Sequence, residues 1–323
     1  MSLIRGLSFF GLCFAFIVIA LGAWTRLVDA GLGCPDWPGC YGFVVFPTTE
    51  AEILLAEQRY PQFPYEIDKA IPEVIHRYFA ATLGFIAILL VVFTFKYRLP
   101  DRIKFIASFL LLFICCQGLF GYLTVSLKLL PVIVTGHLFG GFITLCLFFY
   151  LFLSATDGIK NYRIGHLKLV GAVALIGLII QIFLGAWTST NYASLACADF
   201  PTCQGTFIPE MNFSDGFNLS QEVGPNYLYG LLDNEARVAI HYSHRIGALV
   251  LTLIFIVLIS RLWFSNAAPL ASTLGVILAT QISLGIMNIV YVLPLYIAIA
   301  HNLVAALLLL ATLMVNLVIW KDE

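Results

Sequence analysis

The chain has 323 residues, of which 61% are hydrophobic and 11% charged, and its mean hydropathy is +0.96. Soluble proteins carry about 25% charged residues, so the composition predicts an integral membrane protein embedded in a lipid bilayer. The formal net charge of -1 argues against a nucleic-acid partner. The sequence also contains no phosphate-binding loop, dinucleotide-binding fingerprint or EF-hand loop.

Eight apolar stretches are long enough to cross the hydrocarbon core of a bilayer, which is about 30 Å thick. They fall at 7–25, 77–95, 105–126, 133–154, 167–188, 238–260, 268–291 and 296–319. The first follows Arg5 and has no clear small-residue cleavage site, so we expect a retained helix rather than a signal peptide. The predicted fold is therefore all-α, with eight transmembrane helices.

Basic residues gather in the short connections between these stretches. They are Lys96, Arg98, Arg102 and Lys104 in 96–104, Lys160, Arg163 and Lys168 in 155–168, and Arg261. Short basic connections face the cytoplasm. We therefore expect both termini in the cytoplasm and the long segments 27–75 and 189–236 on the outer side of the membrane.

The two halves of the sequence resemble each other. The segment 184–205, LGAWTSTNYASLACADFPTCQG, aligns without a gap with 21–42, LGAWTRLVDAGLGCPDWPGCYG. The His-Arg pair in VIHRYFAATLG matches that in YSHRIGALVLT, and the histidine in TGHLFGG matches that in IAHNLVA. The pattern predicts two tandem, pseudo-twofold-related four-helix bundles, 1–160 and 161–323, each with one long outer loop.

Two cysteine pairs lie in the long outer loops, Cys34 with Cys40 and Cys197 with Cys203. On the oxidising side of a membrane we expect each pair to form a disulfide within its own loop, and the intervening Asp and Pro favour the required turn. The disulfides could be structural, or they could exchange with a thioredoxin-like thiol partner. A zinc site is disfavoured because neither loop offers clear further ligands.

Four histidines occupy equivalent positions near the outer ends of predicted helices: His76, His137, His244 and His301. An ionisable side chain within a membrane span is costly and points to function. Paired imidazoles facing each other across a four-helix bundle are a common means of binding haem iron. The sequence contains no CxxCH motif, so any such haem is bound non-covalently.

The residues beside two of these histidines bear on the same site. Arg77 and Arg245 each follow a histidine, where a guanidinium could pair with haem propionates or simply extend to water. Glu73 lies three residues before His76 on the same helix face, and its counterpart in the second half is His241. A carboxylate beside only one pocket indicates unequal roles, unless Glu73 only favours the start of a helix after its neighbouring proline.

Taken together, GLGCPDWPGC, EVIHR and the four histidines resemble the haem A synthase family over nearly the whole chain. The resemblance implies an oxidoreductase that converts the C8 methyl of haem O to a formyl group by successive hydroxylation, giving haem A for cytochrome oxidase. It implies that His76 and His137 face the substrate haem O and that His244 and His301 bind a resident haem b. Glu73 matches the family's catalytic carboxylate, whereas His241 matches no residue of known role.

Two other functions remain open from the residues. One is a diheme cytochrome b that relays electrons, and the other is a membrane disulfide or quinone oxidoreductase. Co-purification of haem A would distinguish a synthase from the electron-relaying cytochrome b. Replacement of the four loop cysteines would distinguish a haem protein from the disulfide or quinone oxidoreductase. The resemblance implies haem O synthase and cytochrome oxidase assembly factors as partners, and a homo-oligomer is compatible with it; the sequence does not identify the electron donor.

Overall fold

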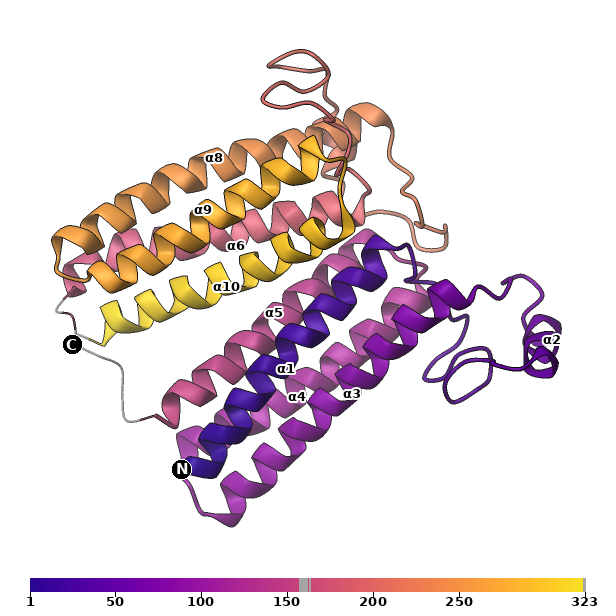
Figure 1. Ribbon diagram of the computed structural model, residues 1–323, viewed down its shortest axis with the longest axis horizontal. Helices are drawn as coiled ribbons and strands as arrows, with labels where there is room; N and C mark the ends of the chain where they lie inside the picture. The colour runs from indigo at the N-terminus through magenta and orange to yellow at the C-terminus, as the bar shows by residue number, and fades with distance from the viewer. Residues whose placement is uncertain (157–161, 163, 322–323) are drawn as a thin grey trace. The chain divides into compact units, whose positions relative to one another are not determined.

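The computed structural model describes residues 1–156, 162 and 164–321, and this part of the chain contains helices and no strands (Figure 1). Eight helices are long and apolar enough to cross a membrane. They are α1 (Ser2–Leu27), α3 (Ile67–Lys96), α4 (Asp101–Ser126), α5 (Pro131–Ser154), α6 (Lys168–Thr190), α8 (Asn234–Phe264), α9 (Ala268–Val290) and α10 (Leu295–Trp320). The predicted all-α membrane fold with eight spans is confirmed. Lys160 and Arg163, which contributed to the predicted orientation, lie outside the described residues.

Helix α3 begins at Ile67 although the apolar stretch that predicted it begins at 77. Its outer turns are polar and continue the helix beyond the apolar stretch, so Glu73 and His76 lie well within a helix rather than at its end. Pro72 lies in this part of α3, and its carbonyl accepts a hydrogen bond from Thr25 of α1 at 3.1 Å. Glu73 and His76 therefore lie in a helical segment that is hydrogen-bonded to α1.

Each half of the described chain forms a ring of four transmembrane helices. In the first, α1 and α4 each pack against both α3 and α5, so α3 and α5 are diagonal neighbours. In the second, α6 and α9 each pack against both α8 and α10, which makes α8 and α10 diagonal. The four histidines predicted as ligands lie on these diagonal helices, where their side chains can face each other across a bundle.

Three short helical segments were not predicted: α2 (Glu50–Arg59), α7 (Phe213–Gly216) and the 3-10 turn η1 (Gly165–Leu167). Helix α2 does carry a sequence signal, the capping box of Thr49 and Glu52. The main-chain N–H of Glu52 donates to Thr49 at 3.3 Å, and the N–H of Thr49 donates to Glu52 at 3.0 Å. The helix is too short and too polar to register in a search for membrane spans.

The first outer loop has a small core of its own. Cys34, Cys40 and Tyr41 pack with Ala56 of α2 and Val74 of α3. The Tyr41 hydroxyl donates to a main-chain carbonyl of the same loop at 3.0 Å, and burial raises the pKa of Tyr41 to about 12. The loop is therefore an ordered cap on the end of α3 rather than a loose connection.

The described chain separates into two compact units. One short segment from the second half of the sequence belongs to the first unit. The first unit contains Met1–Thr156 together with Gln221–Tyr229, although the latter lie in the second outer loop. The N–H of Tyr227 donates to the carbonyl of Lys128 at 3.0 Å. The Tyr227 ring is buried against Leu129 and Leu130 in the turn between α4 and α5. The predicted division at 160 and 161 did not include this exchange, and those two residues lie outside the described part of the chain.

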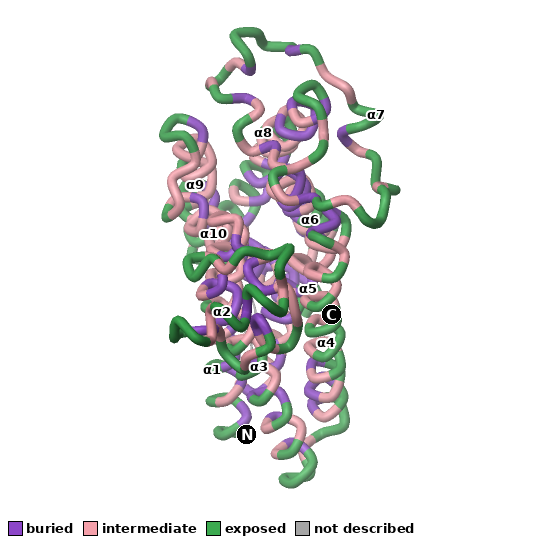
Figure 2. The backbone as a smooth tube through the Cα atoms, turned by 90° about the vertical axis from the view of Figure 1, so that its right-hand side faces the viewer, coloured by how far each residue is buried: buried purple, intermediate pink, exposed green. Residues whose placement is uncertain are grey.

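Exposed residues occur along much of the length of the transmembrane helices (Figure 2), and many of them are apolar. Phe105 of α4 and Val276 of α9, for example, are 71% and 68% exposed. Lipid tails are as apolar as these side chains, so association of helices within a membrane depends on close packing of small residues. Gly11 of α1 illustrates this, because a Cβ there would overlap the ring of Phe148 on α5.

This contact gives a test of how the first bundle packs. Gly11→Val should lower the free energy of unfolding by about 1–3 kcal/mol, the usual effect of overpacking, because Phe148 is fully buried and cannot move aside. Gly6→Val is the matched control in the same helix, since no atom lies within 4 Å of a Cβ there. Thermal unfolding of the detergent-solubilised protein measures both. Equal stability of the two variants would contradict the packing.

Candidate functional site

His76 of α3 and His137 of α5 face each other across the first bundle. Their ring centres are 6.4 Å apart and the ring planes are nearly perpendicular, at 88°. The Nδ1 atoms of both rings are buried and lack hydrogen bonds of normal geometry. A metal–imidazole bond is about 2 Å long, so this spacing fits one iron atom bound between two imidazoles.

Each of the four histidines packs against a glycine of a neighbouring helix. A Cβ would lie 2.9 Å from Cε1 of His76 at Gly22, 3.6 Å from that of His137 at Gly121, 3.1 Å from that of His244 at Gly185 and 3.2 Å from that of His301 at Gly285. The glycines thus leave the space that the imidazole rings occupy. Sequence reasoning missed this role, although Gly22 and Gly185 stand in the LGAWT segments that first showed the similarity of the halves.

In the second bundle, side-chain amides reach the histidines. The Nε2 of Gln181 on α6 lies 3.0 Å from Nδ1 of His244, and the Nε2 of Gln281 on α9 lies 3.3 Å from Nε2 of His301. The side-chain oxygens of both glutamines are buried and unpaired, as is Nδ1 of His301. The second pocket is therefore lined by polar groups whose hydrogen-bonding capacity is not filled by the protein.

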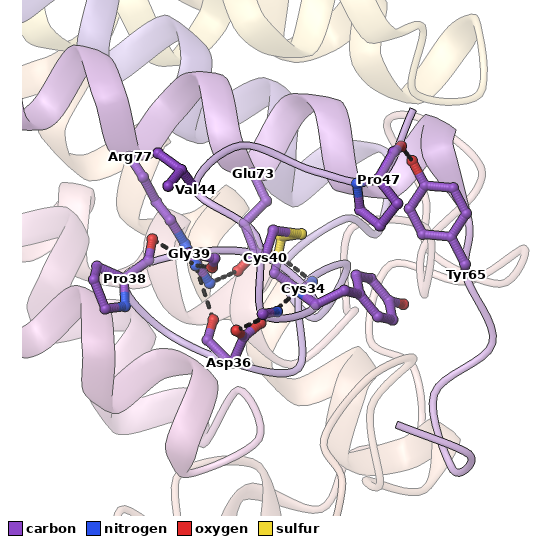
Figure 3. Close-up of a disulfide and its surroundings, with 12 residues drawn as sticks. Cys34, Asp36, Pro38, Gly39, Cys40, Val44, Pro47, Tyr65, Glu73 and Arg77 are labelled. Carbon is purple, nitrogen blue, oxygen red and sulfur yellow. Dashed lines mark hydrogen bonds and ion pairs between the residues drawn. A yellow bond between two sulfur atoms is a disulfide. The ribbon is translucent and has the colours of Figure 1, made fainter. Parts of the chain in front are cut away.

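Glu73 joins the first cysteine loop (residues 34–40) to helix α3 (Figure 3). One carboxylate oxygen accepts from the main-chain N–H of Cys34 at 2.9 Å, and the other forms an ion pair with Arg77 at 2.5 Å. Arg77 also donates to the main-chain carbonyls of Asp36 at 2.9 Å and Gly39 at 2.5 Å. The carboxylate is almost completely buried, so the loop, Arg77 and Glu73 form one connected group at the outer end of the pocket.

His241, to which the sequence assigned no role, takes the same place beside the second cysteine loop (residues 197–203). Its Nδ1 lies 3.4 Å from the N–H nitrogen of Cys197, and its Nε2 lies 3.2 Å from Nε of Arg245. A neutral imidazole accepts at one nitrogen only, so His241 can satisfy one of these donors at a time. Arg245 donates in addition to the carbonyls of Cys197 at 2.6 Å and Thr202 at 2.8 Å.

The two arginines were predicted as possible contacts for haem propionates. In this structure their donors are bound instead to loop carbonyls, as described above, and in the case of Arg77 also to Glu73. The propionate contact stays a prediction. What the geometry adds is a role that the sequence did not suggest, namely holding each cysteine loop against the helix that carries a histidine.

An aspartate closes each cysteine loop. Asp36 accepts from the N–H groups of Tyr41 and Gly42 at 2.6 and 2.8 Å, and Asp199 accepts from those of Gln204 and Gly205 at 2.7 and 3.0 Å. Hydrogen bonds from the Thr202 hydroxyl and from the N–H groups of Gly205 and Gln204 lower the pKa of Asp199 to about 2. Both glycines have a positive φ, near 78°, which explains why glycine is used there.

Each cysteine pair is bonded within its own loop, Cys34 to Cys40 and Cys197 to Cys203. All four residues are at most 2% exposed. A partner thiolate must contact a sulfur atom to exchange with it, so the burial favours the structural reading of these disulfides. Among the described residues, no group of three or more His, Cys, Asp or Glu side chains is placed to hold a bare metal ion.

The arginine contacts predict how the disulfides respond to a reductant. Both should react slowly with a water-soluble phosphine in the folded protein. Arg77→Ala should speed reduction of Cys34–Cys40 because the loop loses its bonds to α3, while Cys197–Cys203 serves as an internal control. Arg245→Ala should instead speed reduction of Cys197–Cys203, with Cys34–Cys40 as the internal control. Mass spectrometry of alkylated peptides reports both, and reduction of the wild-type protein as fast as that of the unfolded chain would contradict the expectation.

Comparison with known proteins places these features in a family. A family model described as COX15-CtaA, cytochrome oxidase assembly protein, matches residues 5–313. The chain is 42% identical to a heme A synthase of Shewanella oneidensis over 97% of this chain and 95% of that protein. It is 28% identical to a heme A synthase of Rickettsia felis over 99% and 97%, and 26% identical to one of Caulobacter vibrioides over 91% and 89%. The chain belongs to the COX15-CtaA family of cytochrome oxidase assembly proteins.

Proposed function

We propose that this protein is an oxidoreductase of the membrane that converts haem O to haem A for cytochrome oxidase. The observation that carries the proposal is the pair His76 and His137, spaced to bind one iron, with a buried carboxylate, Glu73, one turn away on the same helix. The family membership and the relatives named heme A synthase support the same activity.

The two bundles have different tasks in this proposal. His76 and His137 hold the substrate haem O, and His244 and His301 hold a resident haem b. The fit of the second pocket rests on the glycines facing both rings and on the unfilled polar groups around them. When bound, haem b supplies one-electron transfer. The residues of the chain hold the ring in place and exclude lipid and water from it.

Glu73 acts on the methyl group that is oxidised. Oxidation at this carbon develops positive charge and releases protons, and a fixed carboxylate in a site of low dielectric stabilises that charge or accepts a proton. The two hydrogen bonds from Cys34 and Arg77 engage one site on each oxygen. An ionised carboxylate has about four such sites, so Glu73 retains capacity for a proton while its position is fixed.

The proposal includes an orientation in the bacterial inner membrane. The connection between α3 and α4 carries Arg98, and Arg261 lies in the last turn of α8, so these ends of the helices face the cytoplasm together with both termini. The cysteine loops then face the oxidising outer side, in agreement with their disulfides. Haem O synthase and cytochrome oxidase assembly factors are the expected partners, because they supply the substrate and receive the product.

A diheme cytochrome b that only relays electrons would use the same four histidines. That function does not explain why a carboxylate lies beside the first pocket and not beside the second. A disulfide oxidoreductase is disfavoured by the burial of all four loop cysteines. The two following experiments separate the synthase from both.

The first experiment replaces the carboxylate. Glu73→Gln keeps an acceptor for the Cys34 N–H but removes the charge, so the protein should still bind haem and accumulate haem O or its hydroxylated form. The rate of haem A formation should fall about 10²–10³-fold, the usual effect of removing an electrostatic group from a site. Glu73→Asp should be intermediate. Haem extracted from membranes and separated by chromatography gives the result.

The matched control is His241→Gln, which changes the equivalent residue beside the second loop. It should leave haem A formation close to that of the wild type. Production of haem A by Glu73→Gln at the wild-type rate would overturn the catalytic role of the carboxylate.

The second experiment assigns the two pockets. His244→Ala should lose the low-spin haem b signal, whereas His76→Ala should keep it and lose conversion of haem O. Pyridine haemochrome analysis of the purified variants measures haem b, O and A together. An unchanged haem b content in His244→Ala is the result that would refute the assignment.

A further inference from the structure

Both cysteine loops lead into the same tight turn. In the first, Cys40 and Phe43 exchange main-chain hydrogen bonds at 2.9 and 3.1 Å. In the second, Cys203 and Thr206 do so at 2.8 and 3.2 Å. The central residues of these turns all have a positive φ, namely Tyr41, Gly42, Gln204 and Gly205. Two positive φ values in a two-residue turn are typical of the type I′ hairpin, so the chain leaves both turns with equivalent geometry.

The residues that follow these turns are apolar and exposed. Val44 and Val45 form the first loop tip, and Phe207 and Ile208, at the aligned positions, form the second. All four side chains are exposed, Val44 by 80% and Ile208 by 77%. The stretches 40–49 and 203–209 contain no charged residue. An exposed apolar surface of this kind meets either another protein or a membrane.

The first loop tip lies beside α3, on a side of the helix that is open to lipid (Figure 3). The hydroxyl of Tyr78 on α3 donates to the main-chain carbonyl of Val44 at 2.6 Å. Phe85 and Val92 follow Tyr78 at intervals of seven residues, and all three are exposed. Seven residues are about two helical turns, so these side chains share one face of an apolar span. The tip is therefore continuous with a surface that lipid covers.

The place of Tyr78 along α3 gives the depth of the first loop tip. Glu73 and Arg77 precede it, and no charged residue follows it until Lys96. Tyr78 is thus at the boundary of the uncharged part of the span, the level at which tyrosine rings gather in membrane proteins. In lipid an unpaired main-chain carbonyl is costly, and the Tyr78 hydroxyl supplies the donor that the carbonyl of Val44 needs.

We propose that both loop tips enter the leaflet that borders the cysteine loops and contact its lipid acyl chains. Ile246 stands at the position of Tyr78 in the second half, and there the larger side chains of Phe207 and Ile208 provide the apolar contact. Each cysteine loop is then attached to the membrane at its tip and to a helix through its arginine. The inference requires only that these helices span a membrane, so it goes beyond the proposed function and does not depend on the haem assignments.

Spin labels test this contact in nanodiscs of phosphatidylethanolamine and phosphatidylglycerol. The free cysteines are first replaced by alanine, namely Cys13, Cys115, Cys116 and Cys146, and mass spectrometry verifies that both loop disulfides remain. Labels at Val44→Cys and Phe207→Cys should collide often with oxygen, which concentrates in lipid, and rarely with a water-soluble nickel chelate. Phe85→Cys on α3 is the matched lipid-facing control, and Glu57→Cys, exposed on α2, is the water-facing control.

Two results would overturn the proposal. A label at either tip with the nickel accessibility of Glu57→Cys would show that the tip faces water. Low accessibility to both oxygen and nickel would show that protein covers it.

The hydrogen bond from Tyr78 is tested separately. Tyr78→Phe keeps the ring and removes only the hydroxyl, so the label at Val44→Cys should become more mobile. The label at Phe207→Cys should be unchanged and serves as the internal control. Equal mobility at Val44→Cys with and without the hydroxyl would overturn the role of Tyr78 in holding the first loop tip.

Discussion

A buried carboxylate, Glu73, accepts hydrogen bonds from both a main-chain N–H of the first cysteine loop and the guanidinium of Arg77, and the arrangement of the outer end of the first bundle depends on it. A buried donor left without a partner costs about 1–3 kcal/mol, and this carboxylate satisfies two donors at once. Because Glu73 and His76 are three residues apart on α3, the residue that holds the loop and the histidine lie on the same helix. The disulfide keeps the loop closed.

The second loop uses the same positions with a weaker acceptor. His241 contacts its two donors at 3.2 and 3.4 Å and can accept from only one of them, whereas Glu73 contacts both of its donors at 2.9 Å or less. The first group contains an ion pair, while Arg245 has no carboxylate in the corresponding place. The outer end of the second pocket is therefore more positive by about one charge, which favours an anionic group there.

The sequence was sufficient for the features that depend on strong local signals. Long apolar stretches predicted the eight spans, because a bilayer requires that length. His137, His244 and His301 stood out because ionisable residues are rare in such stretches, and His76 stood out because it directly precedes one and matches His244 in the repeat. The contacts of Glu73 with Cys34 and of Arg245 with Cys197 join residues 39 and 48 positions apart, and no local pattern encodes them. The glycines facing the histidines were visible but could not be interpreted, since glycine is common in membrane helices for several reasons. The sequence of helix α2 contains a capping box, but the helix is too short and too polar to be recognised from its hydrophobicity.

The segment Gln221–Tyr229 makes the first half depend on residues of the second half of the sequence. If each half contained all the residues that pack in it, the two could be expressed as separate chains. Here a cut after Thr156 would leave the first half without Tyr227, which covers Leu129 and Leu130. A protein assembled in this way during synthesis inserts four helices before the residues that complete their outer surface have left the ribosome. The first half is thus complete only after the chain has been translated past residue 229, when α6 of the second half has already been made.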